Sequence, residues 1–196
     1  MKTLIDISPE RTGNGFRFRE IYPKIKDAVV IKGMHIVQYK YRVTKNTYPE
    51  FATPYEKLKL LKNKYPDAYV FYVDRDKDEW IPSLYNHWIK HGGTLKFTDW
   101  HNNVMDRRVY ETDKLIDHAK KVFGDNFYLL NFKCFVDDPN TEFNRLLSHF
   151  GLDAIVIVNE KHNASWNSRQ VELCRFFNRI VANYGKAREW VELINK

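Results

Sequence analysis

The residues best suited to chemistry lie in a short loop near the start of the chain. The loop runs from Ser8 to Phe16, with the sequence SPERTGNGF, between an expected strand and an expected helix. Its glycines allow successive backbone N–H groups to point at one centre, and the start of the helix adds the positive end of its dipole. Arg11 adds a fixed positive charge, and Thr12 and Asn14 add side-chain donors. The loop is therefore suited to bind phosphate or sulfate.

An ordinary turn between strand and helix explains the same loop equally well, because glycines also permit tight backbone geometry. The pattern GxxxxGK[ST] of ATP-binding P-loops cannot be aligned with it, which counts against a nucleotide kinase of the P-loop type. Taken alone, the loop leaves both interpretations open.

A second candidate contact for an anion follows a later strand. Arg75 comes just after the apolar run at residues 69–73, at the carboxyl end of an expected central strand, where open α/β sheets bind ligands. Ser83 lies eight positions later, early in the next expected helix. The donor fork of an arginine and a serine hydroxyl together suit a phosphomonoester. The alternative is that Arg75 pairs with Asp76 or Asp78 and that Ser83 is an ordinary polar residue of a helix.

Both candidates depend on a framework that brings strand ends together. Short β-type runs alternate with longer helical patterns, which is typical of βαβ units. Strands are expected at residues 3–8, 29–32, 69–73 and 127–130, with a fifth at 155–158. Helices are expected at residues 16–25, after Thr53, at 80–88, at 115–123, after Asp138, and from Ser168 through Val181. The sequence predicts a three-layer α/β fold whose central, mostly parallel sheet of about four to five strands is flanked by helices.

Length and composition limit the kind of protein. At 196 residues the chain fits one domain over residues 1–196, and 43% hydrophobic residues suffice for a full core. No apolar run approaches the roughly 18 residues of a membrane span and no leader with a cleavage site is visible, so we expect a cytoplasmic protein without a membrane partner. Cys134 and Cys174 form no CxxC pair and are expected to be reduced core thiols.

The chain is basic, with a net charge of +7 from 32 Lys and Arg against 25 Asp and Glu. Such a surface attracts phosphorylated small molecules or acidic glycans, although a basic surface also occurs without a partner. A nucleic-acid partner is not favoured, because the charge is spread without a block of Lys and Arg. His87 and His91 lie four residues apart on an expected helix, but without a compelling third ligand they do not predict a metal site.

Three segments, in order along the chain, resemble the sulfotransferases that use 3′-phosphoadenylyl sulfate (PAPS). Residues from Arg75 to Ser83, with the aromatic residues that follow, resemble the segment of this family that binds the 3′-phosphate. The sequence RTGNGF at residues 11–16 is similar to the 5′-phosphosulfate loop, and residues 128–152 resemble a later strand and helix of the family. The resemblance implies a P-loop-like sulfotransferase fold in a compact member.

The resemblance also implies a reaction and a set of binding residues. A sulfuryl group would move from PAPS to a hydroxyl or amine of a small-molecule or glycan acceptor, without a metal, leaving adenosine 3′,5′-bisphosphate. By this resemblance, the 5′-phosphate would be bound by Thr12, Gly13, Asn14 and Gly15. Phe16 would pack near the adenine, and Arg75 with Ser83 would bind the 3′-phosphate.

Two catalytic roles follow from the same resemblance. Arg11 would stand in for the loop lysine of the family and stabilise the leaving phosphate oxygen. His35 follows the second strand and would act as the general base, since an imidazole titrates near neutral pH. A solvated or packed loop histidine explains His35 nearly as well. Lys32 would help neutralise the sulfuryl oxygens, or would simply end its strand.

The chain departs from the family pattern in two ways. Asn14 and Gly15 stand where the family has paired threonines, and no RKG-type segment or GxxGxxK pattern is visible near the C-terminus. A noncatalytic module of the same fold, which binds a nucleotide or an acidic glycan, is therefore the alternative to an enzyme.

Overall fold

The computed structural model describes residues 1–9, 12–32, 54–105, 107–158, 166–181 and 184–194. They form two compact units. The first unit contains the described residues up to 77 and from 107 to 158, and the second contains those from 78 to 105 and from 166 to 194. A single domain over residues 1–196 stays a prediction.

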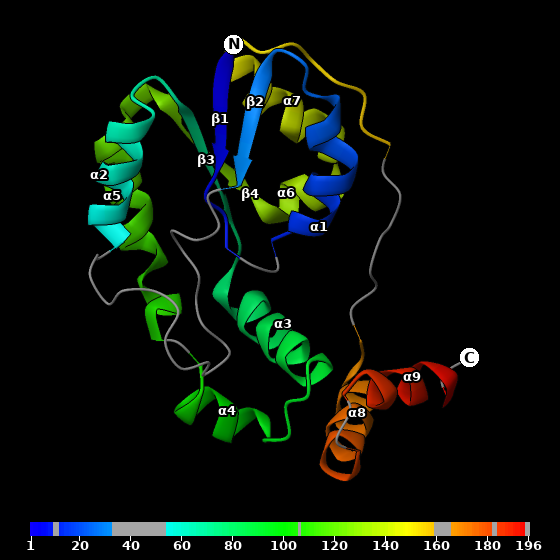
Figure 1. The fold of residues 1–196 in the computed structure, drawn as a ribbon. Helices are drawn as coiled ribbons and strands as arrows, with labels where there is room; N and C mark the ends of the chain where they lie inside the picture. Colours follow the sequence, from blue (N-terminus) through cyan, green and yellow to red (C-terminus); the bar gives the residue numbers. More distant parts are fainter. Residues whose placement is uncertain (10–11, 33–53, 106, 159–165, 182–183, 195–196) are drawn as a thin grey trace. The chain divides into compact units, whose positions relative to one another are not determined.

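The first unit is built on a parallel sheet of four strands in the order β2-β1-β3-β4 (Figure 1). The strands are β1 (Lys2–Asp6), β2 (Ala28–Lys32), β3 (Tyr69–Asp74) and β4 (Phe127–Asn131). The register pairs Leu4 of β1 with Val30 of β2 and with Tyr69 of β3. The predicted α/β fold is thus confirmed. Its sheet is parallel throughout, and long connections that contain helical segments, rather than hairpins, join β1 to β2 and β3 to β4.

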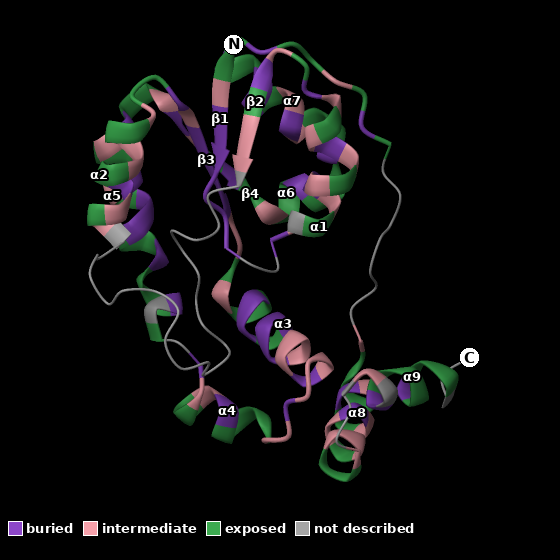
Figure 2. Cartoon of the chain, viewed as in Figure 1, coloured by how far each residue is buried: buried purple, intermediate pink, exposed green. Residues whose placement is uncertain are grey.

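Side chains alternate between the two faces of this sheet, which gives the unit two cores. Leu4, Phe71 and Val73 belong to one core, whereas Ile5 and Val70 belong to the other. Figure 2 shows the buried stretches of β1 and β3. Helices α2 (Pro54–Lys64) and α5 (Thr112–Phe123) cover the second core, and α6 (Phe132–Asp137), α7 (Pro139–His149) and the helical residues before β2 cover the first (Figure 1). The central strands β1 and β3 are buried on both faces, which explains their nearly continuous apolar runs.

The fifth strand expected at residues 155–158 is wrong, since these residues pair with no strand. Side chains of α7 hold the segment instead. The Asn144 amide donates to the Ile155 carbonyl at 2.9 Å and accepts from the Ile155 N–H at 2.9 Å, and the Asn140 side chain accepts from the Ile157 N–H at 3.0 Å. These contacts satisfy the backbone and place Ile157 in the core without a sheet edge.

The helix expected at residues 16–25 begins earlier and is broken into short pieces. They are α1 (Asn14–Phe16), the π-helical η1 (Arg17–Ile21) and the 3₁₀ turn η2 (Tyr22–Lys24). The helix after Asp138 forms as predicted, because the Asp138 carboxylate accepts from the Thr141 N–H at 3.0 Å and caps it. Helix α5 likewise ends at Gly124, whose φ of +55° suits glycine.

The second unit is helical. Its elements are most of α3 (Lys77–Lys90), together with α4 (Phe97–Asn103), α8 (Ser168–Ile180) and α9 (Tyr184–Ile194). Aromatic side chains of α3 and α4 pack together, with Tyr85 and Trp100 ring centroids 5.3 Å apart. The Asn178 amide ties α8 to the end of α3 by donating to the carbonyls of Ile89 and Gly93, both at 2.8 Å. The sequence did not predict α4, α6 or α9.

None of the helices among the described residues is long and apolar enough to cross a membrane.

Candidate functional site

The carboxyl ends of β1 and β3 lie next to each other, and the candidate site is built there. The two strands are adjacent and parallel, with Asp6 opposite Phe71, and the Ile7 N–H donates to the Phe71 carbonyl at 3.0 Å. The segment after β1 therefore begins beside the strand that leads to Arg75. The sequence predicted that the loop follows the first strand and that Arg75 lies at the carboxyl end of a central strand.

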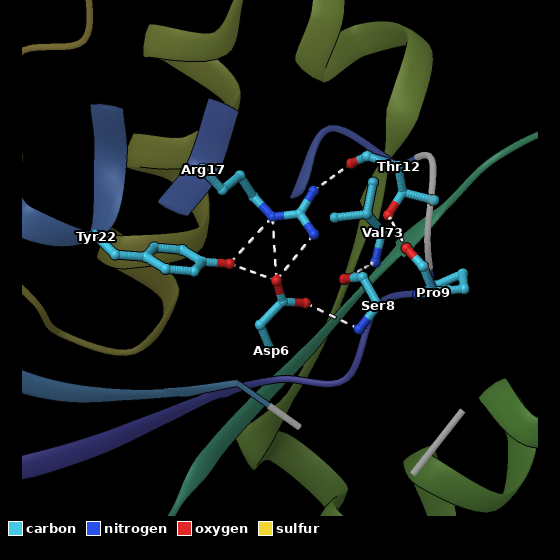
Figure 3. Close-up of polar contacts among 7 residues, drawn as sticks. All are labelled: Asp6, Ser8, Pro9, Thr12, Arg17, Tyr22 and Val73. Carbon is cyan, nitrogen blue, oxygen red and sulfur yellow. Dashed lines mark hydrogen bonds and ion pairs between the residues drawn. The ribbon is translucent and has the colours of Figure 1, made fainter. Parts of the chain in front are cut away.

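The base of the loop is tied to both strands. The Ser8 N–H donates to Asp6 Oδ1 at 2.8 Å, and the Ser8 hydroxyl oxygen accepts from the Val73 N–H at 2.9 Å (Figure 3). Val73 lies two positions before Arg75. One buried serine thus links the start of the loop to the strand that carries the arginine.

A buried ion pair holds the rest of the loop. Asp6 and Arg17 are both fully buried, and Arg17 Nη2 donates to Asp6 Oδ2 at 2.8 Å (Figure 3). The Tyr22 hydroxyl donates to the same carboxylate oxygen, and Arg17 Nη1 donates to the Thr12 carbonyl. Because buried charges must be paired and hydrogen-bonded, this arrangement fixes the end of β1, the backbone of Thr12 and the start of η1 relative to one another.

The pKa values of this network reflect its burial. Burial alone would lower the pKa of Arg17, but attraction to Asp6 and Tyr22 outweighs it and the net pKa is raised. The pKa of Tyr22 is raised well above its usual value, first by burial and then by the charge of Asp6. Arg17 is therefore a permanent cation and Tyr22 a neutral donor at physiological pH.

Gly13 and Arg75 approach the same aromatic ring. Gly13 has a φ of +82°, and a Cβ placed on it would lie 3.1 Å from Phe135 Cε1 and 3.8 Å from Phe132 Cε2. The guanidinium carbon of Arg75 lies 4.4 Å from the centroid of the Phe132 ring. Phe132 is therefore adjacent both to the loop after β1 and to the arginine after β3. Glycine is required at position 13 by its positive φ and by the close Phe135 ring.

The remaining loop residues lie as follows. Thr12 is fully buried and its hydroxyl donates to the Pro9 carbonyl at 2.6 Å, so this hydroxyl serves the shape of the loop, whereas the sequence suggested a donor for an anion. Asn14 begins α1, Gly15 is exposed, and the half-buried ring of Phe16 packs edge-on against Phe135 at 6.2 Å. Among the described parts of this loop, backbone N–H groups are thus the donors on offer.

Arg75 and Ser83 belong to different units. Arg75 follows β3 in the first unit, in the bridge to α3. Ser83 is buried in α3, in the part that belongs to the second unit. Their joint action on one phosphate stays a prediction.

Two predicted residues lie outside the described part of the chain. They are Arg11, the expected leaving-group contact, and His35, the expected general base. Lys32 ends β2, and the register places its backbone opposite Asp6.

Metal chemistry finds no support among the described residues, which contain no group of three or more His, Cys, Asp or Glu side chains that could hold an ion. His87 and His91 contact each other, with ring centroids 4.2 Å apart, and His91 Nδ1 lies 2.7 Å from the His87 carbonyl oxygen. The two imidazoles thus belong to local helix packing.

Comparison with known proteins agrees with this arrangement. A model of the sulfotransferase family matches residues 19–155, which is more than half of the chain. The chain belongs to the sulfotransferase family. A sulfotransferase of Alicyclobacillus acidocaldarius has the same fold, with a TM-score of 0.52 and 15% identity over 91% of this chain and 72% of that one. A search of curated proteins found no match.

The sulfotransferase match begins at residue 19, so the loop between β1 and η1 is known from this structure rather than from the family comparison. The residues that shape this loop, Asp6, Arg17 and Tyr22, were missed in the sequence. One signal was present: Asp6 interrupts an apolar run that should be buried, and a buried carboxylate demands a partner. Nothing in the sequence shows that the partner lies eleven residues later.

Proposed function

We propose that this sulfotransferase moves the sulfuryl group of PAPS to a hydroxyl or amine of a small-molecule or glycan acceptor. The observation that supports this best is the ring of Phe132, which borders the backbone of Gly13 on one side of the site and carries the guanidinium of Arg75. A loop that offers N–H groups and a positive fork thus lie at one sheet edge. A nucleotide with phosphate at both its 5′ and 3′ positions needs two such anion contacts.

The residues present fit this nucleotide by their chemistry. The glycine-containing loop presents backbone donors, which suit the 5′-phosphate, and Arg75 presents a fork that suits the 3′-phosphate, with Ser83 as a second donor. When bound, PAPS supplies an activated sulfuryl group. In this proposal Arg11 neutralises charge on the leaving phosphate oxygen, and His35 accepts the proton of the acceptor as its oxygen or nitrogen bonds to sulfur.

Titration calorimetry with adenosine 3′,5′-bisphosphate tests the binding half of the proposal. The protein should bind this nucleotide, and Arg75→Ala should weaken its binding by about tenfold or more, because a hydrogen-bonded charge pair contributes roughly 1.5–3 kcal/mol. Binding of 5′-AMP, which lacks the 3′-phosphate, should change little. Arg145→Ala, at an exposed arginine of α7 in the same unit, is the matched control. Absence of binding at millimolar nucleotide would refute the proposal.

Transfer of radiolabelled sulfate from PAPS to a panel of phenols, alcohols, amines and glycans tests the chemical half. The proposal is supported if the wild-type protein transfers sulfate and His35→Ala abolishes this transfer while it still binds the nucleotide. Nucleotide binding without transfer to any acceptor class would favour the noncatalytic module, in which the loop residues Asn14 and Gly15 only hold a ligand.

A further inference from the structure

Arg17 makes the hydrogen bonds of its guanidinium inside the protein. It is fully buried, and its guanidinium donates to Asp6 Oδ2 through Nε at 3.2 Å and through Nη2 at 2.8 Å. Its charge is thus neutralised inside the protein. The remaining nitrogen, Nη1, donates to the carbonyl of Thr12, and the backbone N–H of Arg17 donates to the Gly13 carbonyl at 3.0 Å.

The contact between Arg17 Nη1 and the Thr12 carbonyl determines the direction of the peptide group that joins Thr12 to Gly13. Thr12 and Gly13 share one planar trans peptide, in which the C=O and the N–H point in opposite directions. The Thr12 carbonyl points at the buried guanidinium (Figure 3). The Gly13 N–H of the same peptide therefore points away from it. The Gly13 carbonyl accepts from the Arg17 N–H in the first helical turn.

Close packing keeps this peptide from turning over. A Cβ on Gly13 would lie 3.5 Å from Arg17 Nη1 and 3.1 Å from Phe135 Cε1, so the backbone lies against both side chains. The Phe135 ring is itself buried in the core. The peptide is therefore held between the guanidinium and an aromatic ring.

We propose that Arg17 is a positioning residue, which acts through the Thr12 carbonyl to aim the Gly13 N–H at the 5′-phosphate of the bound nucleotide. This inference rests on the proposed function. Asp6 and Tyr22 serve the same end by orienting the guanidinium. The cation never touches the nucleotide, and its effect is confined to the 5′ side of the site.

The decisive comparison uses two nucleotides that differ only at the 5′ position. Lysine at position 17 keeps the charge beside Asp6 but has one nitrogen, so it cannot span both the carboxylate and the Thr12 carbonyl. Arg17→Lys should weaken binding of adenosine 3′,5′-bisphosphate at least about tenfold, and binding of adenosine 3′-monophosphate less than about twofold. Arg145→Lys, at the exposed position on α7, should alter neither affinity.

The outcomes separate this inference from the proposed function. If the wild-type protein fails to bind adenosine 3′,5′-bisphosphate, the proposed function is refuted, and the inference with it. If the wild-type protein binds and Arg17→Lys loses both nucleotides equally, or neither, the inference alone is overturned. An equal loss would indicate general destabilisation rather than positioning.

A measurement on the wild-type protein decides the matter if Arg17→Lys does not fold. The chain has eight glycines, so ¹⁵N-glycine labelling gives a simple amide spectrum. The Gly13 amide proton should shift downfield on addition of adenosine 3′,5′-bisphosphate and stay in place with adenosine 3′-monophosphate. A Gly13 resonance that does not respond to the 5′-phosphate would overturn the inference.

Discussion

The loop after β1 and the arginine after β3 lie at the same sheet edge but are held by different physical means. The loop takes its shape from a buried ion pair and several hydrogen bonds around Asp6, whereas Arg75 rests on one face of the Phe132 ring. A buried charge that loses its partner costs about 3–5 kcal/mol, whereas a cation–π contact contributes about 0.5–2 kcal/mol. We infer that the buried pair preforms the loop on the 5′ side of the site.

The largest expected effect comes from removing the cation of the buried pair. Arg17→Met leaves the Asp6 carboxylate buried without its partner, and the free energy of unfolding should fall by about 3–5 kcal/mol. Urea unfolding followed by circular dichroism measures this. Arg145→Met, which breaks an exposed pair with Glu142, should cost less than about 1 kcal/mol. Equal losses for the two variants would contradict a preformed loop.

A smaller loss is expected at the glycine of the same loop. Gly13→Ala puts a Cβ on a backbone with a φ of +82° and against Phe135, so stability should fall by about 2 kcal/mol and nucleotide affinity should fall with it. Gly15→Ala is the matched control for stability alone, because its Cβ meets nothing closer than 3.8 Å and lies in α1. Calorimetric titration of Gly13→Ala would disprove the preformed loop if this variant bound like the wild type.

Tyr22→Phe removes one hydrogen bond to Asp6, so the free energy of unfolding at neutral pH should fall by about 1 kcal/mol. The folded pKa of Tyr22 is raised by burial and by Asp6, whereas an unfolded tyrosine titrates near about 10. Its stabilisation is therefore complete below that pH and is lost as the pH rises above it. Urea unfolding between pH 8 and pH 11 should show the difference between wild type and variant shrinking with pH, and a constant difference would argue against this role.

The smallest effect is expected at the ring under Arg75. Phe132→Leu removes a cation–π contact worth about 0.5–1 kcal/mol, so affinity for adenosine 3′,5′-bisphosphate should fall about two- to fivefold. Tyr128→Leu, whose ring packs against Phe150, is the control. A loss as large as that of Arg75→Ala would contradict so small a contribution from the ring.

The sequence predicts local structure well, but it does not predict which side chains pair at long range. The strands, the cap at Asp138 and the stop at Gly124 depend on neighbours in the chain, and each was visible in it. The segment 155–158 shows the limit, because its β-branched residues favour a strand, yet the side chains of Asn140 and Asn144 take its backbone groups first. The helical segment before β2 is likewise broken at Arg17 and Tyr22, the two residues that bond to Asp6.

Apolar periodicity and turn residues were enough to specify a parallel α/β layer, and the order of the motifs along it was enough to indicate the sulfotransferase family. These features are local, so they can be recognised in a single chain. Contacts in three dimensions were needed to reveal that Asp6 and Arg17 hold the loop and that Phe132 lies between Gly13 and Arg75. Such partners are far apart in sequence, and only packing brings a buried charge to the residue that neutralises it.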